Sequence, residues 1–105
     1  MKLPAGTVGG LTSSLNLYPF MDRGIVKDFN AVTKAGMYLI GDYDRNYPGN
    51  PGIQYGTLEV YISTDFDNKS TVFVTQIASD MYDQHKMYRR TFTVNNGESV
   101  EWIEV

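Results

Sequence analysis

The second half of the chain alternates apolar and polar residues with the two-residue period of β-strands. In residues 56–63 (GTLEVYIS), leucine, valine and isoleucine take every second position, which is typical of a half-buried antiparallel strand. Residues 71–78 (TVFVTQIA) are apolar at both parities, which favours a central strand. Residues 86–94 (KMYRRTFTV) form the next strand, and residues 98–105 follow a hairpin signal, Asn95-Asn96-Gly97, as its returning strand.

The first third of the chain has a weaker pattern. Residues 37–40 (MYLI) indicate an apolar strand, and residues 20–35 hold the one plausible helix, which Asp28 can cap and Gly36 can end. Residues 1–19 show neither period, so we expect an extended arm, with a disordered tail as the alternative. The predicted fold is α+β and mainly antiparallel β: about five strands, one short N-terminal helix and an N-terminal arm, with the β domain over residues 20–105.

The segment 41–55 (GDYDRNYPGNPGIQY) is a long loop by its turn chemistry, because it holds two prolines, three glycines and two asparagines. Loops of this length in compact domains are often functional. Its aromatic, amide and guanidinium groups suit sugars, since rings stack on apolar sugar faces while polar groups bond the hydroxyls. The candidate ligand-binding residues are Tyr43, Arg45, Asn46 and Tyr47.

The same loop opens with Asp42, Asp44 and Asn46, spaced like the start of a calcium-binding loop. The match then fails, because Tyr47 replaces the required glycine and Ile53 replaces the bidentate glutamate. A solvated turn is the preferred interpretation, and we expect no metal and no cofactor.

Composition limits the functional classes. The 105 residues are 42% hydrophobic and 20% charged, which is the composition of a single globular domain. The net charge is −3 and the only adjacent cations are Arg89 and Arg90, which disfavours a nucleic-acid partner. We expect no membrane insertion and no signal peptide, since no apolar run is long enough. The chain has no cysteine, so oligomerisation is the available substitute for disulfides.

Catalytic chemistry finds little support. The sole histidine, His85, stands in a polar turn without an acidic cluster, so we expect a solvated loop histidine. Carboxylates at predicted strand ends are the remaining catalytic option, but a domain of this size has little room for a deep cleft; these candidates are Asp42, Asp44, Asp65 and Asp67. We therefore expect a protein that is not an enzyme, with a small hydrolase as an open alternative.

Several polar or large residues stand where a core is expected. Arg89 and Arg90 are adjacent in a strand, so one of them must face the core or a partner chain and needs a carboxylate or several carbonyls there. Gln76, in the middle of a strand, raises the same question. We expect these residues to form an internal network or an inter-subunit contact. Trp102 is expected to anchor the core or an interface, with sugar stacking as the alternative.

The order of several short motifs resembles the pyocin-knob family of tail fibres from phages and phage-tail-like bacteriocins. The resemblance covers residues 28–105, about three quarters of the chain. Ser99 stands where the family often has the first of two tryptophans. The motifs are Asp28-Phe29-Asn30, Gly36-Met37-Tyr38, Gly56-Thr57-Leu58, Thr75-Gln76-Ile77, Tyr88-Arg89-Arg90, and Trp102 before Glu104-Val105.

The resemblance implies a receptor-binding domain of a phage virion, carried on a homotrimeric tail fibre and attaching to bacterial surface polysaccharide. Residues 1–19 would then link to the fibre shaft, other tail or baseplate proteins would be partners, and assembly would take place in the host cytoplasm. Two alternatives stay open: a structural spacer or assembly domain of a tail fibre, and an unrelated carbohydrate-binding module.

Overall fold

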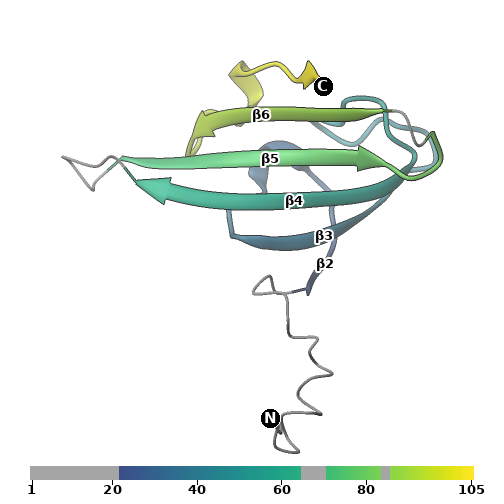
Figure 1. The fold of residues 1–105 in the computed structure, drawn as a ribbon, viewed down its shortest axis with the longest axis horizontal. Coiled ribbons are helices and arrows are strands. Elements are labelled where there is room, and N and C mark those ends of the chain that lie inside the picture. Colours follow the sequence, from purple (N-terminus) through teal and green to yellow (C-terminus); the bar gives the residue numbers. More distant parts are fainter. Residues whose placement is uncertain (1–21, 65–70, 84–85) are drawn as a thin grey trace, which may run out of the picture.

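A computed structural model describes residues 22–64, 71–83 and 86–105, and the strands of this part of the chain form one sheet in the order β2-β3-β4-β5-β6-β7 (Figure 1). The arm 1–19, the turn 65–69 and His85 lie outside the described residues. The strands are β2 Asp22–Ile25, β3 Gly36–Gly41, β4 Tyr55–Thr64, β5 Val72–Asp80, β6 Met87–Thr93 and β7 Ile103–Glu104.

Strands β3 to β6 form an antiparallel meander with an unbroken register. These four strands match the predicted strands closely, and the predominantly antiparallel sheet is confirmed. β5 lies between β4 and β6, as its apolar residues at both parities predict.

The first strand of the sheet was not predicted. β2 pairs in parallel with β3, which makes the sheet mixed. All four of its residues are exposed, so it carries no apolar alternation that a sequence pattern could reveal. The prediction of about five strands is therefore corrected to six within the described residues.

The predicted short helix is only a single 3₁₀ turn, η2, over Phe29–Ala31, and Val32 already has an extended conformation. Asp28 does act as the N-cap, and its carboxylate accepts a hydrogen bond from the Asn30 N–H at 3.0 Å. Gly36 does not end a helix but begins β3. The β-branched Val32 and Thr33 favour the extended chain that ends the turn.

The predicted returning strand 98–105 is also shorter than expected. Residues Gly97–Ser99 form a second 3₁₀ turn, η3, and only Ile103–Glu104 pairs with β6, as β7. Asn95 has a φ of 75°, and the Asn96 N–H donates to the Thr93 carbonyl, which closes a tight turn. The chain then continues into η3 and pairs with β6 only from Ile103. The carbonyls of Gly97 and Val100 are held over the sheet by a buried side chain described below.

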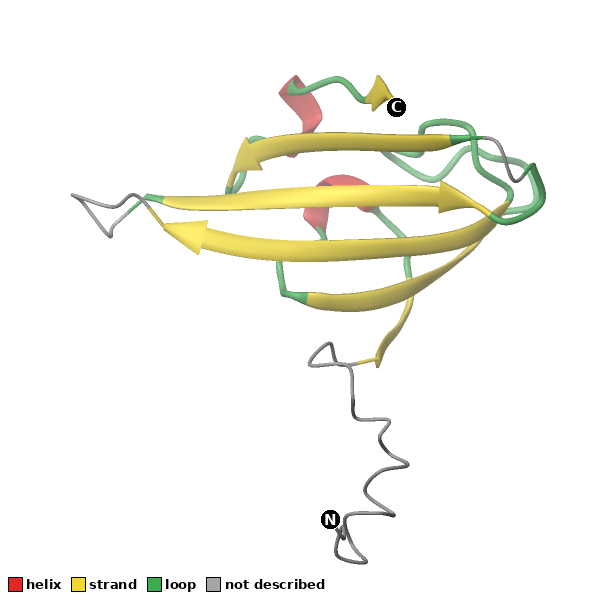
Figure 2. Cartoon of the chain, in the orientation of Figure 1, coloured by secondary structure: helices red, strands yellow, loops and turns green. Residues whose placement is uncertain are grey.

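The core lies on one face of the sheet, called here the inner face. The two 3₁₀ turns are the only helical turns among the described residues, and η2 lies behind β4 and β5 in the view of Figure 2. Phe29 and Ile53 are fully buried and bring the η2 turn and the 41–55 loop onto the sheet. The buried apolar residues are Val26, Phe29, Ile40, Ile53, Leu58, Val60, Val74, Ala78 and Phe92.

No helix in the described segments has the length and apolar character that crossing a membrane requires.

Candidate functional site

The meander brings two connections to the same end of the sheet. The 41–55 loop joins β3 to β4, and residues 81–86 join β5 to β6, so both leave the sheet at the right-hand end in Figure 1. The register fixes this, because Gly41 pairs with Tyr55 and Gly56 pairs with Asp80. The Met81 N–H also donates to the Tyr55 carbonyl at 3.0 Å, which ties the second connection to the start of β4.

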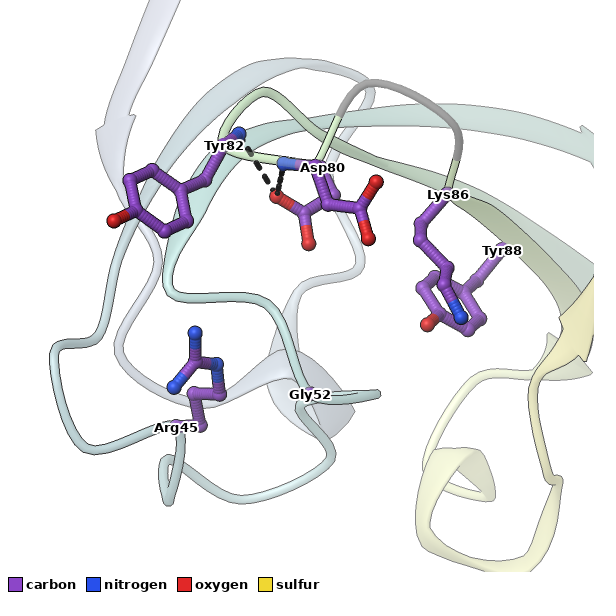
Figure 3. Close-up of a pocket in the computed structure, with 7 residues that line it drawn as sticks. Arg45, Gly52, Asp80, Tyr82, Lys86 and Tyr88 are labelled. Atoms are coloured by element: carbon purple, nitrogen blue, oxygen red, sulfur yellow. Dashed lines mark hydrogen bonds between the residues drawn. The ribbon is translucent and has the colours of Figure 1, made fainter.

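An open groove lies between these two connections. Its volume is about 750 Å³. Figure 3 shows Arg45 and Gly52 on one side of it and Asp80 and Tyr82 on the other, with Lys86 and Tyr88 at one end. We call this the loop-end groove, and its lining residues are Arg45, Gly52, Asp80, Tyr82, Asp83, Lys86 and Tyr88.

The loop-end groove carries charges of both signs. Arg45 and Lys86 are cationic, while Asp80 and Asp83 are acidic. The Asp80 carboxylate accepts hydrogen bonds from the backbone N–H groups of Tyr82 and Asp83, each at 2.9 Å, so it also shapes the turn. This mixture of donors, acceptors and aromatic rings suits a ligand with many hydroxyl groups.

A second hollow of about 430 Å³ adjoins the first, because Tyr88 lines both. Its other lining residues are Pro51, Glu101, Trp102 and Glu104. Lys86, which lines the loop-end groove, forms a 3.7 Å ion pair with Glu104. The two hollows therefore share Tyr88, and the second also has Trp102 in its lining.

Asp42 organises the loop that forms one wall of the groove. Its side chain is almost fully buried, and its Oδ2 accepts hydrogen bonds from the Tyr47 N–H at 2.7 Å and the Asn50 Nδ2 at 2.8 Å. Asn50 Oδ1 in turn accepts from the backbone N–H groups of Gly52 and Ile53. The carboxylate resembling the first ligand of a calcium loop is thus satisfied by the protein's own donors. The described residues contain no group of three or more His, Asp or Glu side chains that could hold a metal.

Burial of the Asp42 carboxyl raises its pKa, but hydrogen bonds from Tyr47, Asn50, Asn46 and Arg45 outweigh this effect, and the net pKa lies below its ordinary value. A carboxyl whose pKa is lowered by folding stabilises the fold above its unfolded pKa of about 3.9, and this stabilisation is lost as the pH falls through the folded pKa.

Asp42→Asn should therefore lower the free energy of unfolding at pH 7 by about 1–2 kcal/mol, because a charged acceptor of several hydrogen bonds is lost. Its stability should also fall less than that of the wild type as the pH drops below about 4. Urea unfolding at pH 7 and at acidic pH measures both effects. The exposed Asp44→Asn is the matched control. Equal acid sensitivity of Asp42→Asn and wild type would contradict this role.

The four predicted ligand-binding residues do not act as one cluster. Arg45 lines the groove, with a left-handed φ of 57°, and its Nη2 donates to Gln54 Oε1 at 3.3 Å. Tyr43 is 72% exposed but does not line the groove, and Asn46 is exposed without lining it. Tyr47 is half-buried against the core, with Lys27 Nζ 5.6 Å from its ring centroid.

Two of the three polar residues predicted as scaffolding, Gln76 and Arg90, meet in the core, and the third, Arg89, does not. Arg90 is buried on the inner face, whereas Arg89 is exposed on the opposite face. Arg90 pairs across the strands with Gln76, and its Nε donates to Gln76 Oε1 at 2.9 Å. Gln76 Nε2 donates to the Phe29 and Val32 carbonyls at 2.8 and 3.0 Å, which attaches the η2 turn to β5.

Neutral oxygens satisfy the rest of the Arg90 guanidinium. Nη1 donates to the carbonyls of Gly97 and Val100 at 3.0 and 3.1 Å, and Nη2 donates to Asn30 Oδ1 at 3.1 Å. Burial lowers the pKa of Arg90 to about 10, and the charge of Asp28 partly opposes this. Arg90 thus connects both 3₁₀ turns to the sheet.

Trp102 closes this network at the surface. Its ring lies 4.3 Å from the Arg90 guanidinium carbon, and its Nε1 donates to the Gly49 carbonyl at 2.7 Å. The ring also packs edge-on against Phe29, with centroids 6.3 Å apart. Trp102 therefore connects the C-terminal segment to the 41–55 loop, while part of it lines the second hollow.

The sequence predictions missed most of the groove. Five of its lining residues lie outside the loop singled out: Asp80 at the end of β5, Tyr82, Asp83 and Lys86 in the β5–β6 connection, and Tyr88 near the start of β6. A usable signal did exist, because in an antiparallel meander every second connection lies at the same end of the sheet. Asp80 at the end of β5 and Tyr82 and Asp83 after it therefore lie at the same end of the sheet as the 41–55 loop.

Comparison with known proteins gave no match to a protein-family model, a curated protein or a solved structure.

Proposed function

We propose that this chain is a non-catalytic receptor-binding domain of a phage tail fibre, and that it attaches the virion to a glycan on the host-cell surface. The observation that carries the proposal is the loop-end groove, where exposed Tyr82 and half-buried Tyr88 stand among Arg45, Lys86 and two aspartates. The tail-fibre assignment is supported by the resemblance of residues 28–105 to knob domains.

The chemistry of the groove favours a carbohydrate. Aromatic rings stack on the apolar faces of sugars, and guanidinium, ammonium and carboxylate groups bond to hydroxyls. The groove is open, and the hollow beside Trp102 shares Tyr88 with it, so sugar units have room on both sides of this residue. An open groove suits attachment to a polymer better than enclosure of a small substrate.

Tyr82→Ala should weaken glycan binding about five- to tenfold, because a stacking ring contributes roughly 1–1.5 kcal/mol. Tyr43→Ala is the matched control, since both tyrosines are 72% exposed and only Tyr82 lines the groove. Arg45→Ala should also weaken binding. The probes are immobilised lipopolysaccharide O-chains, capsular polysaccharides and teichoic acids, with whole bacterial cells as the second readout.

Binding to one of these probes that depends on Tyr82 and not on Tyr43 supports the proposal. If no probe and no cell panel binds the chain, the attachment function is wrong. If Tyr43→Ala abolishes binding while Tyr82→Ala leaves it intact, the attachment function stands but the site is misplaced.

A further inference from the structure

The face of the sheet opposite the core, called here the outer face, is covered by no described element and carries several exposed apolar side chains. Ile25, Leu39, Tyr61, Met87 and Ile103 are each between 41% and 58% exposed. The register places all five on this face. Tyr61 follows the inward-facing Val60 along β4, and the other four pair with outward-facing residues of neighbouring strands. The polar Thr57 and Ser79 lie between Leu39 and Met87, so the face is mixed, and several exposed apolar side chains on one face favour an interaction surface.

The charges on the outer face have a symmetrical arrangement. One row of side chains crosses the sheet in the order Asp22, Met37, Glu59, Ile77, Arg89, Ile103. From β3 to β7 the row is apolar, acidic, apolar, basic, apolar, and this part of it is centred on Ile77 of β5.

Within one chain Glu59 and Arg89 do not neutralise each other. They lie on strands separated by β5, which places their backbones roughly 10 Å apart. The only ion pair within the described part of the chain joins Lys86 and Glu104. Glu59 accepts a hydrogen bond from the Tyr61 hydroxyl at 2.8 Å, which holds its carboxylate on this face.

We propose that the outer face binds a second copy of this chain, face to face, about a two-fold axis that runs along β5. Rotation about this axis leaves the height of each residue along β5 unchanged. It places the β4 side of one copy over the β6 side of the other. Ile77 then meets Ile77 of the second copy, and Glu59 meets Arg89 of the second copy on each side of the axis. Each protomer supplies both members of the charge pairs, as an interface with two-fold symmetry requires.

A two-fold axis that crosses the strands along this row is disfavoured. It would place each strand over its own copy, so Glu59 would meet Glu59 and Arg89 would meet Arg89. Like charges brought together at an interface are strongly unfavourable. The favoured pairing is an aligned β-sandwich with sheets about 10 Å apart, and it leaves the loop-end groove at the sheet end uncovered.

The charge pattern gives an exchange experiment. In Glu59→Arg, two cations of one copy face two cations of the other, and in Arg89→Glu two anions face two anions. Each variant alone should therefore associate at least about tenfold more weakly than the wild type. An equimolar mixture of the two should form a heterodimer, because every facing pair is then of opposite charge. The double variant E59R/R89E should form a homodimer.

Sedimentation velocity of the full chain and its variants over a micromolar-to-millimolar concentration series measures these states, and circular dichroism verifies that each variant is folded. A wild-type dimer, monomeric single variants and a dimer in the mixture support the proposal. A monomeric wild type, a trimer of the kind that the family resemblance implies, or a mixture that stays monomeric would overturn it. None of these outcomes changes the glycan-binding test, which measures binding at the loop-end groove.

Discussion

Arg90→Ala is expected to lower the free energy of unfolding by about 3–5 kcal/mol, because several buried acceptors lose their donor and each unsatisfied buried group costs about 1–3 kcal/mol. The substitution leaves four buried or half-buried oxygens without their donor, and they belong to Gln76, Gly97, Val100 and Asn30. A domain of this size has a total stability of roughly 5–15 kcal/mol, so the loss is a large part of the whole. Urea unfolding followed by circular dichroism measures it.

Arg89→Ala is the matched control for this prediction. It removes the same side chain from the next position of β6, but from the exposed outer face, and should change stability by no more than about 0.5 kcal/mol. Arg90→Lys should fall between wild type and alanine, since one ammonium group cannot reach acceptors on both 3₁₀ turns. Equal stability of Arg90→Ala and Arg89→Ala would show that the buried guanidinium does not hold the turns to the sheet.

Gly56→Ala is expected to cost about 3 kcal/mol, the upper part of the usual range for overpacking. A Cβ at this position would overlap the carbonyl oxygen of Ser79 on the neighbouring strand. That oxygen belongs to the backbone of β5, so relief requires the two central strands to separate where they lead into the groove.

Gly41→Ala is the control, because a Cβ there meets nothing within 4 Å and the residue lies at the same end of the sheet. Thermal and urea unfolding of both variants should separate them clearly. If both lose the same stability, backbone crowding at Gly56 is not the cause.

The four strands that the sequence predicts well are those with a strong period of two. In β4, for example, the inward-facing positions are mostly apolar and the outward-facing positions mostly polar, so the two-residue period is visible in the sequence. β2 could not be found in this way, because its backbone pairs with β3 while its side chains stay exposed. The pairing of β2 with β3 is a contact between distant residues, and a local sequence pattern does not predict it.

The C-terminal segment shows a second limit of sequence patterns. Residues 98–105 have the composition of a strand, but the Arg90 guanidinium binds the carbonyls of Gly97 and Val100 and holds that segment over the inner face. A tertiary contact from another strand thus overrides the local preference. The sequence indicated that one of the two adjacent arginines must be satisfied internally, but not that it would reshape the chain end.

The groove was predictable only in part. Turn chemistry located the 41–55 loop and hence Arg45, while Tyr43 and Tyr47 proved to lie outside the groove and against the core respectively. The hydrogen bonds of Asp42 and Asn50 bend the loop and so determine which of its residues face the groove. The composition of the loop does not predict these contacts.

The most direct measurement of glycan binding at the loop-end groove is a pair of ¹H–¹⁵N correlation spectra of the full chain, without and with an oligosaccharide from the surface polysaccharide that binds. The backbone signals that shift should belong to Arg45, Gly52, residues 80–83, and Lys86 and Tyr88, with smaller changes near Trp102. Shifts confined to the outer face, around Glu59, Ile77 and Arg89, would contradict the assignment of the site, as would a spectrum that does not change.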